Sequence, residues 1–306
     1  MPSVDLSVHS NVPPRLLDRN GLRIRKDVLY TDAKGREKNK LRKRVEEAFD
    51  DFGEILRRVL EPNETIFYVA RAQAMPGAFA QFFGGGWHTY SLPGALLFFT
   101  QRRIIALRVR KRRGGWIWDR GIRTLRWGDL ASVKSAGFLT RYLTLTFRAG
   151  GKQTYWRFSS GNLKKTKMLI DVLLPNGSGE MTQAAAMVSL CPTCFAILSA
   201  GKYECQACGL RFKDENTLVR RGILIPGGAT FYVGAPVLGV LRAVTESILL
   251  VFGGLMLLAV LVTASEYKDP VGGAFGGLLV LGLLALDKSA AIIISRQQIR
   301  DFLPAK

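Results

Sequence analysis

The stretch LLFFTQRRIIAL, from Leu96 to Leu107, indicates how the N-terminal half of the chain folds. It places a short polar segment, Thr100–Arg103, between two apolar runs. A short apolar run that ends at polar turn residues is typical of a β-strand. We therefore expect strands over Leu92–Thr100 and Arg103–Val109, paired antiparallel across the turn.

Similar strand-like runs continue on both sides of this hairpin. Many of them alternate apolar and polar residues, as antiparallel strands with one buried face do. The glycines of Arg148–Lys152 suit a hairpin turn, where positive φ is needed. A helix is expected over Asn162–Leu174, because capping residues precede it and Pro175-Asn-Gly ends it. The further expected strands are Thr65–Ala70, Trp116–Trp118, Ile122–Trp127, Ala131–Ser135, Tyr142–Arg148 and Gln153–Phe158.

A helix is also expected before the strands. Residues 40–60 read KLRKRVEEAFDDFGEILRRVL, with apolar positions spaced close to 3.6 residues apart. The run Arg42-Lys43-Arg44 near its start is either a membrane or nucleic-acid patch or the solvated face of the helix. Residues 1–39 are polar and include Pro13 and Pro14, so we expect a mobile basic arm that can contain one short ordered piece.

Several short motifs resemble those of bacterial pleckstrin-homology-like domains. That family shows a Thr-x-x-Arg turn between two apolar strands, as at Thr100–Arg103. Its next element pairs an aromatic residue with Asp-Leu or Asp-Ile, as in Leu125–Leu130. Leu60–Glu64 resembles the start of the family's first strand, and Tyr142–Phe158 resembles its last hairpin.

The resemblance covers about residues 45–175 and implies a β-sandwich or barrel with a C-terminal helix, within an α+β, mainly β class. The chain departs from the family pattern in two inserted segments, the glycine-rich Ala78–Trp87 and the basic loop Arg110–Gly115. Relatives bind lipids, peptides or nothing known, so the resemblance alone implies no single ligand.

The four cysteines form two matched pairs, Cys191-Pro-Thr-Cys194 and Cys205-Gln-Ala-Cys208. A C-x2-C turn brings two thiolates to one ion, and two such turns complete the tetrahedron that zinc accepts. Gly209 follows the second pair, where a residue that tolerates positive φ is needed. We expect a structural Zn²⁺ held by Cys191, Cys194, Cys205 and Cys208 in a zinc ribbon, since four thiolates leave no open position for catalysis. A disulfide pair, a thioredoxin-like redox site and a rubredoxin-like iron site are the alternatives.

Two apolar segments near the C-terminus are candidates for membrane spans. Ile248–Ala264 contains no charged residue and, with its flanks, reaches the ~20 residues that cross a bilayer. Val271–Leu286 reaches that length only if Asp287 and Lys288 lie near the headgroups or face a partner helix. The alternative is a buried helical hairpin in a soluble protein.

The link between these segments is short, so both ends of the hairpin lie on one side of the membrane. Lys and Arg residues flank the hairpin, whereas the link carries one Lys and two acids. The positive-inside rule therefore predicts a multi-pass protein of the cytoplasmic (inner) membrane with both termini cytoplasmic. Reduced cysteines fit that compartment. The flanking basic residues are Lys213, Arg220, Arg221, Arg296, Arg300 and Lys306.

The segment before the first span, Ile223–Gly234, is loosely similar to paired-helix membrane domains that are often found with zinc ribbons. Their first segment carries Pro-Gly and Phe-Tyr-x-Gly, here Pro226-Gly227 and Phe231-Tyr-Val-Gly234. We expect an interfacial or re-entrant helix over residues 216–240. Arg242 and Glu246, spaced i,i+4, are expected to pair near the membrane surface.

The charge of the chain points to an anionic partner. The formal net charge is +20, and residues 1–175 hold 33 Lys and Arg against 15 Asp and Glu. Guanidinium groups fit phosphate and Trp prefers the membrane interface, so we expect one basic run to bind anionic phospholipid or an acidic protein. A solvated loop and nucleic-acid binding are the alternatives. The predicted lipid- or anion-binding residues are Arg108, Arg110, Lys111, Arg112, Arg113 and Trp116.

Enzymatic activity is not expected, because the sequence contains no nucleophile–base pair, hydrolase metal spacing or phosphate loop. Paired glycines in the spans, such as Gly253-Gly254, make a homo-oligomer plausible. The predicted organisation is a mobile basic arm (1–39), a pleckstrin-homology-like domain with an N-terminal helix (40–175), a linker (176–188), a zinc ribbon (189–213), an interfacial segment (214–240) and a two-helix hairpin (241–306, with spans at about 243–264 and 271–294).

Overall fold

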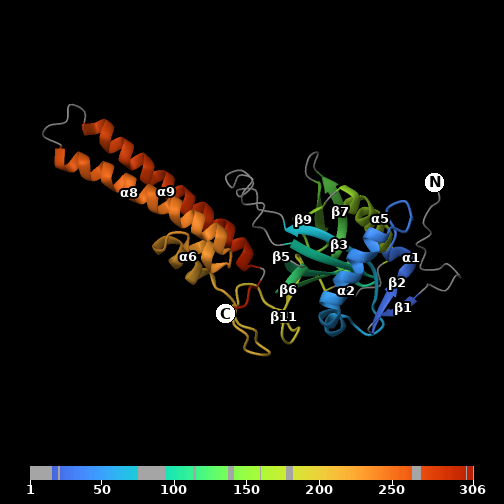
Figure 1. Ribbon diagram of the computed structural model, residues 1–306. Helices are drawn as coiled ribbons and strands as arrows, with labels where there is room; N and C mark the ends of the chain where they lie inside the picture. The colour runs from blue at the N-terminus through green and yellow to red at the C-terminus, as the bar shows by residue number, and fades with distance from the viewer. Residues whose placement is uncertain are drawn as a thin grey trace. The chain divides into compact units, whose positions relative to one another are not determined.

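The computed structural model describes most of the chain as two compact units (Figure 1). The first unit comprises residues 1–75 and 92–210, and the second comprises residues 76–91 and 211–306. The described residues are 16–19, 21–74, 94–112, 115–136, 141–158, 160–176, 182–263, 270–300 and 302–305.

The first unit is a curled antiparallel sheet that forms a half-barrel. Four consecutive strands make one meander, and three more make a second. Strand β9 pairs antiparallel with β3, from Ala72↔Phe158 to Ala74↔Trp156, and so joins the two meanders into one sheet. The strands are β3 (Thr65–Ala74), β4 (Gly94–Thr100), β5 (Arg103–Arg112) and β6 (Gly115–Arg126), then β7 (Leu130–Ala136), β8 (Arg141–Phe147) and β9 (Lys152–Phe158).

The hairpin expected over residues 96–107 is confirmed, with Phe98 opposite Ile105 and Phe99 opposite Ile104. The two short strands expected at 116–118 and 122–127 are instead one strand, β6. The register between β5 and β6 shifts between Leu107 and Val109, and Arg120 has φ 58°. This local irregularity breaks the alternation of the sequence, so one long strand looked like two.

Strands β4 and β5 and most of β3 are buried on both faces, which differs from the one-sided burial that the alternation predicted. Helix α5 (Ser160–Asn176) packs Leu169 and Ile170 against the inner face of the curl. Helix α2 (Asn39–Val59), which the 3.6-residue spacing predicted, covers the outer face with Phe49 and Phe52. Because apolar side chains meet β4 from both sides, nearly all of that strand is buried.

Part of the predicted mobile arm belongs to the core. Strand β2 (Leu22–Arg25) pairs parallel with β3, and Ile24 lies opposite Ile66. Leu22 and Ile24 are at most 2% exposed, and Leu29 of the one-turn helix α1 (Lys26–Leu29) is equally buried. The prediction of a mobile arm is therefore wrong for residues 22–30. Residues 16–19 form β1 (Leu16–Arg19), which pairs with β2, and residues 1–15 lie outside the described part.

The predicted linker 176–188 is also docked on the half-barrel where it is described. Thr182 donates its backbone N–H to the Asp129 carboxylate at 2.7 Å, and Met187 is buried in the core. Strand β10 (Val188–Leu190) then pairs antiparallel with β6, and β11 (Ile197–Leu198) pairs with β10. The cysteine-rich segment thus continues the same sheet.

The residues that carry the family resemblance meet at one buried point. Arg103 donates to both carboxylate oxygens of Glu64, at 3.1 and 2.8 Å, and to the Val59 carbonyl at the end of α2. Thr100 donates to Glu64 at 2.6 Å, and the Trp127 indole donates to the Thr100 carbonyl at 2.8 Å. These motifs therefore hold the fold together, because they tie α2, the hairpin turn and the end of β6 to one another.

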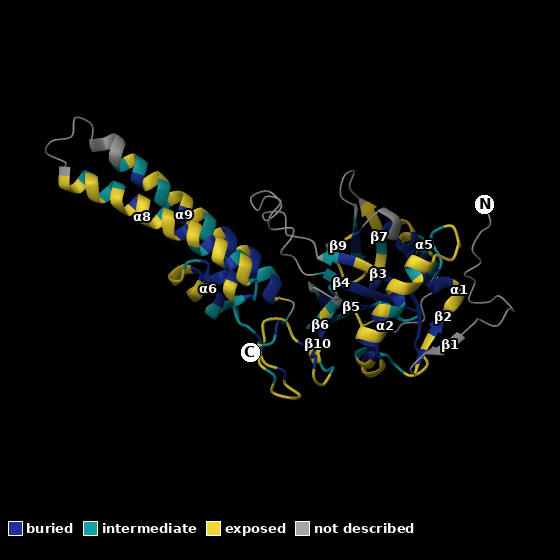
Figure 2. Cartoon of the chain, viewed as in Figure 1, coloured by how far each residue is buried: buried dark blue, intermediate teal, exposed yellow. Residues whose placement is uncertain are grey.

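The described part of the second unit is mostly helical. The short helices α6 (Glu215–Leu224) and α7 (Gly228–Tyr232) precede the long helices α8 (Pro236–Thr263) and α9 (Pro270–Ile299). The stretches Pro236–Val262 and Ala274–Ile299 are long and apolar enough to cross a membrane, and only 11% and 28% of their most apolar windows are buried (Figure 2). This exposure favours membrane spans over the buried hairpin of a soluble protein.

Glycines bring α8 and α9 close together. A Cβ on Gly277 would lie 2.7 Å from the Leu257 side chain, and one on Gly253 would lie 3.1 Å from Leu281. These two positions thus serve packing within the hairpin, as small residues do between membrane helices.

Candidate functional site

The four cysteines lie on two turns with the same local geometry. The Phe195 N–H donates to the Cys191 carbonyl at 3.0 Å, and the Gly209 N–H donates to the Cys205 carbonyl at 2.9 Å. Gly209 has φ 71°, as its position after the second pair predicted, and Phe195 occupies the matching position with φ 60°. The sequence repeats C-x2-C, and the structure repeats the turn that it encodes.

The sulfur atoms surround a common centre. The Sγ atoms of Cys191 and Cys208 are 3.6 Å apart, those of Cys194 and Cys205 are 3.5 Å apart, and all four lie within 4.8 Å of one another. A disulfide would require ~2.05 Å, so these four cysteines are not oxidised in pairs. Ligands at ~2.3 Å from a tetrahedral zinc would stand about 3.8 Å apart. The group can hold a metal ion, and its dimensions fit a four-thiolate site.

The surroundings of the thiols differ between the two turns. Burial raises the pKa of the Cys191 thiol to about 12, although hydrogen bonds from the backbone N–H groups of Cys194 and Thr193 lower it. Burial opposes ionisation of Cys205 as well, but backbone N–H groups of Ala207 and Cys208 lower the pKa of that thiol to about 7. Backbone donors that point at sulfur favour the thiolate, the form that binds metals.

The first cysteine turn rests on the half-barrel. The guanidinium of Arg58, at the end of α2, lies 4.8 Å from the Phe195 ring centroid and donates to the Thr193 carbonyl at 3.1 Å. Strand β10 enters this turn directly from its pairing with β6. No local sequence pattern predicts this attachment, because Arg58 lies far from the cysteines along the chain.

The structure places the described members of the predicted anion-binding set, Arg108, Arg110 and Trp116, on two faces of the sheet. Arg108 is only 7% exposed and its Nε lies 2.8 Å from Asp119, which also pairs with Arg110 at 3.0 Å. Val109, between them, faces the core under α2, and Trp116 packs against that same core. Because side chains alternate along a strand, Arg108 and Arg110 point away from Trp116.

Arg108 is thus an internal ion-pair partner of Asp119 and is not available to an external anion. The side chains of Lys111 and Arg112, and all of Arg113, lie outside the described residues. A basic residue that the sequence analysis missed, Arg71 on β3, does meet Trp116, with its guanidinium carbon 3.7 Å from a ring centroid. No local sequence signal could have found this contact, because it depends on strand register.

In the second unit, buried charges link the helices. Glu246 of α8 accepts from Lys288 of α9 at 2.8 Å and from the Gly227 N–H at 3.0 Å. Lys288 also donates to the Gly222 carbonyl at 3.1 Å, and Arg242 lies 3.5 Å from Asp287. Arg242 and Glu246 are spaced to pair with each other within α8, but each has a partner on α9. Asp287 and Lys288 thus face a partner helix. This meets one of the two conditions under which the second apolar segment is long enough to cross a bilayer.

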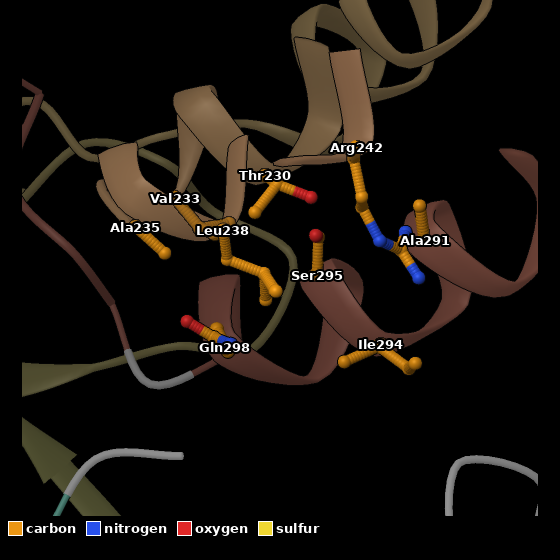
Figure 3. A pocket seen from close by; sticks show the side chains of 9 residues that line it. All are labelled: Thr230, Val233, Ala235, Leu238, Arg242, Ala291, Ile294, Ser295 and Gln298. Atoms are coloured by element: carbon orange, nitrogen blue, oxygen red, sulfur yellow. The ribbon is translucent and has the colours of Figure 1, made fainter. Parts of the chain in front are cut away.

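A small pocket lies beside Arg242 between α7, α8 and α9 (Figure 3). Its polar lining comprises Thr230, Arg242, Ser295 and Gln298, all buried. Its volume of about 10 Å³ is near the minimum that holds one water molecule. The pocket therefore suits a bound water molecule and is too small for a lipid headgroup.

Comparisons with known proteins identify no family. No family model matches the chain, and no curated protein matches it. Among solved structures, the crystal structure of the C-terminal domain of an unknown protein from Leishmania infantum is 9% identical, and the match covers 42% of this chain and 98% of that chain with a TM-score of 0.28. A likeness this low supports no conclusion about fold or function.

Proposed function

We propose that this protein is a membrane-anchored binding or scaffold protein whose basic half-barrel engages anionic lipid headgroups. The protein would have no catalytic activity. Helices α8 and α9 would anchor it in the membrane. The observation that carries the proposal is the exposed apolar surface of these two helices in a chain of net charge +20. A cationic domain that is tethered to a bilayer is held where it meets anionic headgroups.

Apolar exposure extends beyond the two spans and supports an interfacial segment over residues 216–240. Ile223, Leu224 and Ile225 at the end of α6 are each at least 48% exposed. Arg220 and Arg221 precede these three apolar residues, with Gly222 between. Basic and apolar residues side by side are typical of a helix that lies in the headgroup layer. With the basic flanks of the hairpin, this favours the cytoplasmic membrane with both termini inside.

The topology of the half-barrel supports a pleckstrin-homology-like domain. Two successive antiparallel meanders are followed by a helix, and the resemblance implies a β-sandwich or barrel with a C-terminal helix. Such a domain would present loops at the open end of its sheet to the ligand.

The four-cysteine group is proposed to hold zinc. Tetrahedral thiolate sites suit zinc or iron, and a closed four-cysteine set is typical of structural zinc. The metal would hold the two cysteine turns together and supply no catalytic chemistry.

We retain the tip of the β5–β6 hairpin as the lipid contact and omit Arg108. Arg110 is 41% exposed in its side chain although it pairs with Asp119, and Lys111, Arg112 and Arg113 complete the basic run. A basic residue near an anionic leaflet contributes about 1 kcal/mol, so these residues together would hold the domain against the membrane.

Hydrogen exchange of the full-length protein in lipid nanodiscs tests this proposal. We expect the peptides that cover residues 108–120 to exchange more slowly in phosphatidylcholine discs that also contain phosphatidylglycerol than in phosphatidylcholine alone. The triple variant K111Q/R112Q/R113Q should lose this difference. Equal exchange of the wild-type peptides in both kinds of disc would refute the lipid contact.

A further inference from the structure

Tyr232, the last residue of α7, is fixed in the second unit by the two residues that precede α6. Its hydroxyl accepts from the Asp214 backbone N–H at 3.1 Å and donates to the Asp214 carboxylate at 3.3 Å. Its carbonyl accepts from the Lys213 ammonium at 2.5 Å. The half-buried ring is therefore held in one orientation by bonds at both ends of the residue.

Two cations lie on this ring. The guanidinium carbon of Arg221, on α6, is 5.1 Å from the ring centroid, and Lys213 Nζ is 5.5 Å from it. Both distances are within the ~6 Å of a cation–π interaction. The ring thus brings together two positive charges that are separated along the chain.

Arg221 is exposed, and within the described residues no carboxylate pairs with it. The acidic residues nearest to it in the sequence serve other groups. Asp214 is the N-cap of α6. Glu215 lies 3.8 Å from Arg296 and 3.9 Å from Arg300. An anion from outside the chain would give Arg221 an acceptor, and the guanidinium fork matches two oxygens of a phosphate.

Exposed apolar residues follow Arg221 on the same side of α6. Leu224 and Ile225 come three and four positions later, which is the spacing of neighbours on one helix face. They are 68% and 48% exposed. Four residues rise about 6 Å along a helix, which is comparable to the depth at which an interfacial helix places its apolar side below the headgroups. A phosphate at Arg221 would therefore have its acyl chains beside Leu224 and Ile225.

Close packing fixes the turn between α6 and α7. A Cβ on Gly222 would lie 2.7 Å from the Ile292 side chain of α9, and one on Gly227 would clash with the Gly239 carbonyl of α8. Helix α6 lies against α9 (Figure 1). The cations and the apolar residues are thus positioned before a ligand arrives, so little further ordering opposes binding.

We infer that Arg221, supported by the Tyr232 ring, binds the phosphate of an anionic phospholipid whose acyl chains lie along Leu224 and Ile225. The inference rests on the proposed membrane anchor and adds a lipid site in the second unit, apart from the half-barrel. Lys213 contributes positive charge to the site. Phosphatidylcholine carries a cation of its own, which Arg221 and Lys213 would repel, so the site should select phosphatidylglycerol.

The test uses the purified full-length protein in neutral detergent, where no charged membrane surface is present. Native mass spectrometry then counts the phosphatidylglycerol and phosphatidylcholine that remain bound. Arg221→Gln should bind phosphatidylglycerol about 10-fold more weakly, the low end for a lost hydrogen bond between charged groups. L224N/I225N keeps the guanidinium and should also retain less lipid, because the acyl chains lose their apolar contact.

Arg220→Gln is the matched control. It removes the same charge from the neighbouring exposed residue, whose side chain points about 100° away around the helix. It should retain phosphatidylglycerol as the wild type does. Equal loss in R220Q and R221Q would show a dependence on charge alone and would overturn the inference.

The hairpin-tip variant K111Q/R112Q/R113Q separates this site from the lipid contact proposed for the half-barrel. We expect this variant to keep the phosphatidylglycerol that R221Q loses. If R221Q retains the lipid as the wild type does, the inference is overturned and the half-barrel contact is untouched. If the wild type does not prefer phosphatidylglycerol in detergent, the inference also fails, whereas hydrogen exchange of residues 108–120 in nanodiscs decides the half-barrel contact separately.

A last comparison identifies the source of the phosphate. Retention of phosphatidylglycerol in the presence of excess inorganic phosphate supports a lipid site. Displacement by inorganic phosphate, together with unchanged retention in L224N/I225N, would overturn the assignment to a lipid.

Discussion

Replacing Glu246 with Gln should loosen the turn between α6 and α7. The Glu246 carboxylate accepts from Lys288 and from the Gly227 N–H, while Lys288 donates to the Gly222 carbonyl in the last turn of α6. One ion pair thus satisfies polar groups that the break between the two helices leaves unpaired. A lipid environment offers no water to replace these partners.

The magnitude follows from the burial of the pair. Glu246 is 2% exposed, and removing one partner of a buried ion pair costs about 3–5 kcal/mol. Gln can still accept from Gly227, so we take about 3 kcal/mol, which corresponds to roughly a 150-fold larger open population of the turn. Lys288→Met should cost at least as much, because it also removes the donor to Gly222. The double variant E246Q/K288M leaves no unpaired charge and should cost less than the sum of the two.

Hydrogen exchange of residues 222–232 in detergent micelles measures this opening directly. The Gly227 amide should exchange roughly 150-fold faster in E246Q than in the wild type. Thr245→Val, one residue away on α8, removes a hydroxyl that bonds only within the helix to Leu241 and should leave the rate unchanged. If both single variants protect Gly227 as well as the wild type, or if the double variant costs the full sum, the ion pair does not hold the turn.

Three further outcomes are expected. Elemental analysis should find one zinc ion per chain, which Cys205→Ser or acidification removes, since protons compete with the metal for the thiolates. Burial lowers the pKa of Lys165 to about 7, against an opposing effect of Asp32. The unfolded chain then binds more protons than the folded chain between that pH and 10.5, so the free energy of unfolding should rise with pH in this window in denaturant titrations, and K165M should lack the rise. Arg103→Met should lower the free energy of unfolding by about 3–5 kcal/mol because it leaves Glu64 buried without its cation, whereas Arg102→Gln, at a partly exposed ion pair, should cost less than about 1 kcal/mol; equal costs would contradict this role of Arg103.

Local patterns in the sequence were enough to find most strands and the cysteine turns. The hairpin over residues 96–107 and the helix α2 each carry their own periodicity, and C-x2-C spacing determines a turn without help from distant residues. Tertiary contacts decide the rest. Strands β2 and β10 are too short to show a period, and only their pairing with β3 and β6 makes them strands.

The same limit explains the errors at the charged sites. Arg108 and Trp116 looked like one cluster because they are close in sequence, but strand alternation places them on opposite faces. Glu246 was assigned to Arg242 one turn away, while its cation, Lys288, comes from the next helix. In both cases the contact partner is determined by the packing of strands or helices and not by closeness in the sequence.

The pairing of β10 with β6 has a practical consequence for dissecting the protein. A chain cut after residue 175 would lack β10 and would leave the backbone groups of Ile122 and Thr124 without their partner strand. A bare strand edge readily recruits another chain, so such a fragment should associate with itself and mimic a natural oligomer. Any fragment meant to report on the isolated half-barrel should therefore run through Leu198, and with it the first cysteine turn.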